Sequence, residues 1–225
     1  MPSNIESARS DDVRPEQVDD IEGGFRIHSS MVRANLNFFS MDFHDEIAPI
    51  GELDATGFIQ LRKNIDRSYR RGAELDFALS LSPHFGVDGN CTWMKSRIRE
   101  YAPAGDPAVY ENVVQALSPE WLGSLGLDWK AGRNISFRCQ GKYIGKSFLE
   151  PTNQPGLTIP AAFVISASAR IEIFRNLRGE LILDNLADQI YYTNGSPVVN
   201  GSGVTEPGYF VQAPRSLYLM FSYRL

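Results

Sequence analysis

The sequence predicts an all-β fold in which about nine antiparallel strands form a segment of a transmembrane β-barrel. Three observations support this prediction. Apolar and polar side chains alternate with a period of two, which is typical of β-strands. The charged residues lie on one side of this alternation, and the connections between strands are by turns very short and long. The sequence contains no apolar run of about 18 residues that would predict a transmembrane helix, but membrane β-barrels cross with strands instead.

The composition fits one sizeable folded domain. The chain has 225 residues, of which 43% are hydrophobic and 22% are charged, and this balance excludes a disordered protein. The formal net charge of −5 argues against nucleic acid as a partner. The first ten residues contain no apolar signal-peptide core, so we expect either a cytoplasmic chain or a true N-terminus further upstream. Cys91 and Cys139 are the only cysteines and predict neither a metal site nor a disulfide.

The first two expected strands are 19–28 and 32–43, joined by a two-serine turn. Each alternates apolar side chains with polar or charged ones. In the second strand the apolar phase changes at Phe39, and a β-bulge is the expected cause. A long polar connection over 44–68 follows, with extended strand at its far end.

The next two strands, 72–81 and 85–94, show the clearest alternation. In 72–81, leucine, phenylalanine and alanine alternate with acidic and small polar residues. A tight turn at 82–84 contains serine and proline, which favour turns. A charged stretch and a long proline-containing connection over 101–120 come next.

Three further strands are expected at 123–130, 135–143 and 163–173. Each alternates aliphatic or aromatic side chains with charged or hydroxyl-bearing ones. A short turn at 131–133 joins the first two strands, and a long loop over 145–160 precedes the third.

A short turn at 176–179 predicts a hairpin into the strand 180–186. A loop rich in glycine, proline and asparagine then covers 188–215, before the final strand 216–225, which reads SLYLMFSYRL. One face of this final strand carries Leu217, Leu219, Phe221, Tyr223 and Leu225.

The charged residues test these strand phases, because the phases rest on the apolar residues alone. Ten charged side chains fall opposite the apolar face: Glu74, Asp76, Asp88, Asp128, Lys130, Arg138, Lys142, Arg170, Glu172 and Arg224. A soluble antiparallel sheet with one wet face would alternate equally well. The connections favour the membrane barrel, because short turns at one end and long loops at the other are typical of bacterial outer-membrane barrels.

Several stretches resemble the TonB-dependent outer-membrane receptors, and their order and spacing match the C-terminal part of that family's barrel. They are ANLNFF at 34–39, MDFHDEI at 41–47, RGAEL at 71–75, DNLADQIYY at 184–192, and the Pro-Arg-Ser that leads into the final strand. The Asn-Leu-x-Asp-x-x-Tyr box is the most specific of these. Two features depart from the family pattern: the chain ends in Leu225 where the family usually ends in Phe, and no plug domain or TonB box precedes the barrel.

The resemblance implies a barrel of about 22 strands, of which the nine expected here are less than half. Residues 1–225 would then be the C-terminal portion of a TonB-dependent receptor barrel, with the plug domain absent. The implied function is TonB-dependent uptake, across the bacterial outer membrane, of a scarce ligand such as a ferric siderophore. Implied partners are the lipid bilayer, lipopolysaccharide, the barrel assembly machinery, a small-molecule ligand such as a ferric chelate, and the TonB complex through the missing plug. A stand-alone β-barrel that binds a ligand or acts as a passive pore is the alternative.

The resemblance also sets an orientation. Counting back from a periplasmic C-terminus places the short turns in the periplasm and the connections 45–68, 101–120, 145–160 and 188–215 outside the cell. Residues 1–18 would be the remnant of another external loop. The assembly signal of the final strand falls on Phe221, Tyr223 and Leu225.

Candidate ligand-binding residues lie in these external segments. The basic residues Arg62, Lys63, Arg67, Arg70 and Arg71 could attract anionic ferric chelates, or form a charged rim that stays hydrated or contacts lipopolysaccharide. The tyrosines Tyr69, Tyr101, Tyr110, Tyr191 and Tyr192 fit either ligand stacking or an interfacial girdle. Six residues are predicted to bind the ligand: Arg62, Arg67, Tyr69, Arg70, Tyr101 and Tyr110.

The sequence predicts no metal site, no cofactor and no catalytic centre. His44-Asp45-Glu46 has residue types that bind metals, but no second histidine lies nearby, and a solvated strand end is the expected role. The three histidines, at 28, 44 and 84, form no catalytic constellation with serine, cysteine or aspartate. We therefore expect a protein that is not an enzyme.

Overall fold

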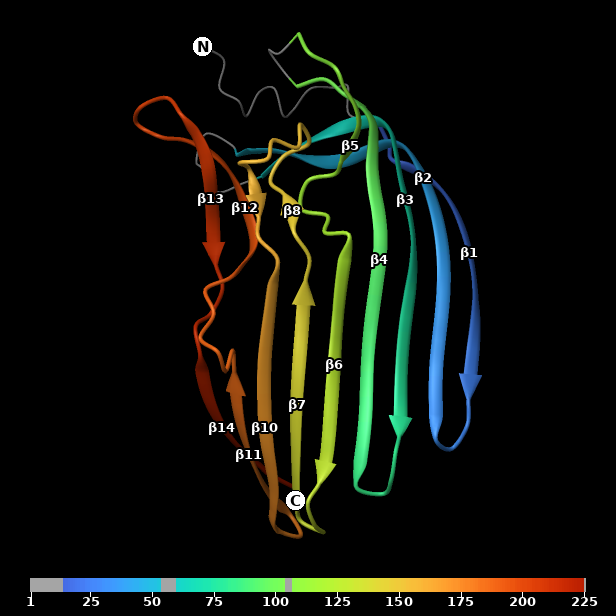
Figure 1. The fold of residues 1–225 in the computed structure, drawn as a ribbon, viewed down its shortest axis with the longest axis vertical. Coiled ribbons are helices and arrows are strands. Elements are labelled where there is room, and N and C mark those ends of the chain that lie inside the picture. The colour runs from blue at the N-terminus through green and yellow to red at the C-terminus, as the bar shows by residue number, and fades with distance from the viewer. Residues whose placement is uncertain (1–13, 54–59, 104–106, 225) are drawn as a thin grey trace.

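A computed structural model describes residues 14–53, 60–103 and 107–224. Its main feature is a ten-stranded antiparallel sheet in which neighbours along the chain are also neighbours in space. Nine strands follow one another across the sheet, and a tenth, short strand pairs beside them. The strands run side by side as a curved wall, with the short turns at one end, which is the lower end in Figure 1. The all-β prediction is confirmed.

The nine successive strands of the sheet correspond one to one to the nine that the alternation predicts. They are β1 (Gln17–His28), β2 (Val32–Leu53), β3 (Gln60–Ser80), β4 (Phe85–Tyr101), β6 (Trp121–Lys130), β7 (Ile135–Ile144), β10 (Ala162–Phe174), β11 (Leu177–Asp184) and β14 (Ser216–Tyr223). In the described residues, β1 and β14 each pair along one side only, so the sheet is an open part of a barrel.

The prediction of a long polar connection over 44–68 is wrong for most of its length. β2 continues to Leu53 and β3 starts at Gln60, and the two remain paired beyond His44, with Glu46 opposite Ile65 and Pro49 opposite Arg62. β4 likewise continues past Met94 through the charged stretch to Tyr101. These extensions bend across the upper end of the sheet in Figure 1.

The β-bulge predicted at Phe39 is also wrong. The register of β2 with β1 and with β3 runs without a shift from Arg33 to His44. Phe39 stays in phase on the polar face because Gly72 stands directly opposite it: a Cβ atom on Gly72 would lie 2.7 Å from the Phe39 ring. Such a separation is shorter than any real contact, so the glycine provides the space for this aromatic ring.

The other long connections contain short strands that the sequence does not predict. These are β5 (Tyr110–Val114), β8 (Ser147–Phe148) paired with β9 (Thr158–Ile159), and β12 (Tyr192–Val199) paired with β13 (Thr205–Val211). β5 runs along the same edge of β4 as β6 does, and residues 115–120 separate the two. The turn predicted at 176–179 is smaller than expected, because Leu177 and Arg178 already pair with β10.

Buried apolar residues gather only at the long-connection end of the described structure. One cluster joins β2, β3, β4 and β5 and consists of Ala48, Ile65, Ile98, Tyr101 and Val113. A second consists of Leu149, Leu157 and Ile159, against which the stacked rings of Tyr192 and Tyr209 pack, 4.2 Å apart. In the described part of the chain, no helix has the length and apolar character needed to cross a membrane.

Candidate functional site

The candidate site is the sheet itself, whose two faces have opposite chemistry. On one face, the large apolar side chains are exposed, because no second layer of the described structure covers them. Five of them on three strands are between 41% and 64% exposed: Leu125, Leu127, Phe137, Leu217 and Leu219. A soluble protein rarely leaves so extended an apolar surface open to water. This face therefore requires an apolar environment.

The opposite face carries polar and charged side chains that bond from strand to strand. Arg138 of β7 pairs with Asp128 of β6 and, at 2.7 Å, with Asp88 of β4. On β2, the Asn35 amide donates to Asp76 of β3 at 2.8 Å. Every side chain in these contacts remains partly exposed, so the face suits a hydrated interior rather than a dry core.

At the long-connection end, a buried polar network joins three strands to the segment after β5. The Glu46 carboxylate accepts hydrogen bonds from Ser68, Arg70 and the Gln115 amide. The Gln115 carbonyl oxygen accepts from Ser96 at 2.6 Å and from Arg70 at 3.0 Å. Arg70 also lies over the Phe43 ring. Because each buried polar group has a partner, the network holds 115–120 against the sheet instead of leaving a vacant ligand site.

In the described structure, the six predicted ligand-binding residues take part in several separate contacts. Arg62 and Arg67 are exposed on β3, and Arg62 donates to the Ile47 carbonyl oxygen at 3.4 Å. Tyr69 donates to Asn112 at 3.2 Å. The remaining three are held by other groups, since Arg70 belongs to the buried network, Tyr101 is in the first apolar cluster and Tyr110 packs against that cluster. Ligand binding by these residues stays a prediction.

His44-Asp45-Glu46 does not act as one cluster. Asp45 has a positive φ of 55° and pairs with Arg14 at 2.8 Å, while Glu46 is in the buried network. The hydrogen bond from Arg14 to Asp66, followed by the charge of Asp45, raises the pKa of Arg14 above its ordinary value. Among the described residues, no group of three or more His, Cys, Asp or Glu side chains is arranged to hold a metal ion.

The Asn-Leu-x-Asp-x-x-Tyr box forms a tight structural turn. Asn185 is 1% exposed, has a positive φ of 50°, and its amide nitrogen donates to the carbonyl oxygens of Gln189 and Ala213. Asp188 accepts a hydrogen bond from the Arg215 backbone nitrogen at 2.9 Å. These bonds join the end of β11 to the start of β14. Asparagine and aspartate suit the box because both tolerate positive φ and bond to nearby backbone.

The predicted assembly signal lies on the final strand. Phe221 and Tyr223 are each 64% exposed on the apolar face of β14, and Leu225 lies outside the described residues. Cys91 and Cys139 are both free and lie on β4 and β7, and β6 separates the two strands.

Comparisons with known proteins agree with this geometry. The family described as TonB dependent receptor-like, beta-barrel matches residues 2–186. No curated protein matches the sequence. Among solved structures, the siderophore receptor PiuA from Acinetobacter baumannii aligns with a TM-score of 0.69 at 15% identity over 92% of this chain and 28% of its own.

Two other solved structures align equally well. The ferric yersiniabactin uptake receptor FyuA from Yersinia pestis gives a TM-score of 0.70 at 17% identity, over 92% of this chain and 30% of its own. The copper transporter OprC gives 0.72 at 15% identity, over 95% of this chain and 32% of its own. The chain thus spans about a third or less of each solved chain, and at these identities the likeness is one of fold.

Proposed function

Because this chain belongs to the family of TonB-dependent receptor-like β-barrels, we propose that residues 1–225 form the C-terminal part of the wall of an outer-membrane receptor barrel. The family consists of outer-membrane transport receptors rather than enzymes. The receptor takes up a scarce ligand, and a ferric siderophore is the ligand class that its structural neighbours favour.

The observation that carries this proposal is the exposed apolar face. Leu125, Leu127 and Leu219 are about half exposed or more, and none of the described segments forms a layer above them. Lipid hydrocarbon solvates such a face, whereas water would not. The charged pairs on the other face, such as Arg138 with Asp88, then lie in a hydrated lumen.

The two sheet edges support a place in a larger wall. β1 and β14 each leave one row of backbone N–H and C=O groups without a strand partner in the described residues. In hydrocarbon, each unpaired group costs several kcal/mol. Further strands of the receptor satisfy both edges in the proposed barrel, which in this family has about 22 strands.

In the proposed orientation, the short turns face the periplasm and the long-connection end faces the outside. The extensions of β2, β3 and β4 and the hairpin β12–β13 form the surface that a ligand meets first. Energy for uptake arrives through a plug and the TonB complex, and the barrel assembly machinery recognises the final strand with Phe221 and Tyr223. We infer the plug, the TonB complex and the barrel assembly machinery as partners from the family to which this chain belongs.

The membrane assignment is tested at two neighbouring positions on β7. A fluorophore on the native Cys139, in a Cys91→Ser background, should be quenched strongly by brominated lipids, because Cys139 is exposed on the apolar face. The same fluorophore on Gln140→Cys, in a background without other cysteines, should not be quenched, because residue 140 faces the lumen. If neither position is quenched in folded protein, the apolar face is an internal core, and the alternative of a stand-alone β-barrel that binds a ligand is favoured.

Uptake is tested in a strain that lacks the gene. Growth at low iron on a panel of ferric chelates should fail for at least one chelate and return when the gene is restored. That growth should also require TonB. Growth that persists without TonB would indicate a passive pore instead, and unchanged growth on every chelate would contradict iron uptake.

A further inference from the structure

On the apolar face, two cationic side chains stand directly opposite each other. Arg71 of β3 pairs in register with Lys95 of β4, and both are exposed. Like charges directly opposite in an antiparallel pair destabilise a sheet. An anion between the two side chains would reverse this effect.

The surroundings of this pair contain more positive than negative charge. Arg71 and Arg99 lie over the Tyr69 ring, at 4.9 and 5.9 Å from its centroid. The Asp42 carboxylate is 3.8 Å from Arg71 and 3.5 Å from Arg99, so one carboxylate serves two guanidinium groups. On the same face, Arg97 is neutralised by Glu120 at 3.0 Å. Lys95 has an aromatic neighbour, because its ammonium lies 5.8 Å from the Trp93 ring centroid.

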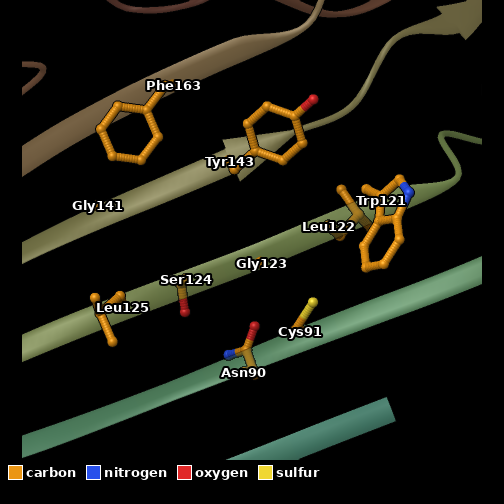
Figure 2. Close-up of a pocket in the computed structure, with 10 residues that line it drawn as sticks. All are labelled: Asn90, Cys91, Trp121, Leu122, Gly123, Ser124, Leu125, Gly141, Tyr143 and Phe163. Atoms are coloured by element: carbon orange, nitrogen blue, oxygen red, sulfur yellow. The ribbon is translucent and has the colours of Figure 1, made fainter. Parts of the chain in front are cut away.

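Next to this cationic patch, the same face contains an open apolar groove of about 270 Å³. Figure 2 shows that its lining comes from four adjacent strands, with Cys91 on β4, Trp121 and Gly123 on β6, Gly141 and Tyr143 on β7, and Phe163 on β10. The groove exists because small residues, Cys91, Gly123 and Gly141, lie between large aromatic ones.

The groove and the cationic patch are continuous along β4. Cys91, Trp93 and Lys95 occupy alternate positions and therefore share one face. Trp93 pairs with Trp121, which lines the groove, and their ring centroids are 6.4 Å apart. Cations, an aromatic band and an apolar groove thus follow one another from the long-connection end toward the middle of the sheet.

We propose that this surface binds one phosphorylated lipid of the outer leaflet, with its phosphate between Arg71 and Lys95 and an acyl chain in the groove. Arginine and lysine both form strong charge-assisted bonds to phosphate. A lipid fits better than a free anion, because the cations adjoin tryptophan side chains, which favour the membrane interface, and an apolar groove. The site rests on the proposed function only in requiring that this face meets a membrane.

The phosphate part of the site is tested with the protein made from its full reading frame and purified in detergent. The probes are diphosphorylated lipid A, the same lipid without phosphates, and inorganic phosphate, and native mass spectrometry measures binding. The double variant Arg71→Gln/Lys95→Gln should weaken lipid A binding at least tenfold. The matched control Arg133→Gln/Arg175→Gln removes two exposed cations at the short turns and should leave binding unchanged. Equal binding of the phosphate-free lipid, or full competition by inorganic phosphate, would overturn the proposal.

The groove is tested with the two native cysteines. Cys91→Phe fills the groove and should weaken lipid A binding severalfold without altering the binding of inorganic phosphate. Cys139→Phe adds the same ring on the same face outside the groove and should bind lipid A as the native protein does. Equal effects of the two variants would overturn the groove assignment. If the fluorophore on Cys139 is quenched by lipid but none of these substitutions weakens lipid A binding, the proposed lipid site is wrong while the proposed membrane barrel is supported.

Discussion

The two ends of the sheet use apolar side chains in opposite ways. Toward the short turns, Leu127 and Phe137 are exposed on a single-layered wall. At the long-connection end, Ile98 and Leu149 are completely buried in small clusters, as in a soluble protein. The same chain therefore folds against two solvents, lipid along the wall and water beyond it. Apolar side chains therefore face outward where the surroundings are lipid and inward where the surroundings are water.

Two arginine–glutamate pairs show the same contrast for charge. Glu46, which is 4% exposed, pairs with Arg70 inside the buried network. Glu180 pairs with Arg170 across β10 and β11 at 3.0 Å, and the Arg170 side chain is 47% exposed. The Glu46 carboxylate is almost completely removed from water, whereas the Glu180 carboxylate is 20% exposed beside a half-exposed arginine, so the first pair should matter more for stability.

The largest effect is expected from Glu46→Ala. This change leaves Arg70, Gln115 and Ser68 without their shared acceptor, and breaking a buried pair in this way costs about 3–5 kcal/mol. Hydrogen exchange should show faster opening of the segment around Gln115, while exchange in the wall strands stays slow. Glu111→Ala, an exposed carboxylate of β5, is the control and should have little effect. Unchanged exchange around Gln115 would mean that the network does not hold this segment.

The next largest effect is expected from Leu75→Arg. Leu75 faces lipid on β3, and arginine near the middle of a bilayer costs about 2–4 kcal/mol in a membrane barrel. Thr92→Arg is the matched control, because residue 92 faces the lumen opposite Glu74, which would pair with the new charge. Denaturant unfolding from lipid vesicles measures both. Equal costs at the two positions would contradict the assignment of the two faces.

The smallest effect is expected from Glu180→Gln. Glu180 is partly exposed and its partner Arg170 is about half exposed, and a pair that water still reaches contributes about 0–1 kcal/mol. The free energy of unfolding in vesicles should therefore change by less than about 1 kcal/mol. A loss comparable to that of Glu46→Ala would show that the lumen side of β11 is dry. The contrast between the two ends would then disappear.

The wall could be predicted from the sequence because each of its strands lies between lipid and water, which requires strict alternation. That requirement ends where β2 and β3 leave the wall, since water and loops then contact both faces. The basic residues Arg62 and Lys63 therefore predict a connection although they lie in a paired strand. A bulge is predicted at Phe39 because an aromatic ring is unexpected on the polar face. The sequence does not show that Gly72 stands opposite and provides space for the ring.

The candidate site could be predicted less well than the wall, because its contacts join distant segments. The sequence predicts that Arg70 is exposed, because it lies in a basic stretch. Its burial in the network depends on Gln115, which follows 45 positions later. Tyr101 shows the same limit, since its burial depends on β5, a strand too short to show a period. The pairing of Lys95 with Arg71 could not be predicted, because it depends on the register between β3 and β4.

The turn formed by Asn185 and Asp188 affects how freely this protein can change over evolutionary time. Its hydrogen bonds to Ala213 and Arg215 close the whole excursion of 188–215 at its base, so β14 keeps its position whatever lies between. With the ends fixed, doubling the length of a flexible excursion costs only about 0.6 kcal/mol of closure entropy. The hairpin β12–β13 can therefore be lengthened, shortened or replaced while the wall beneath it retains its register.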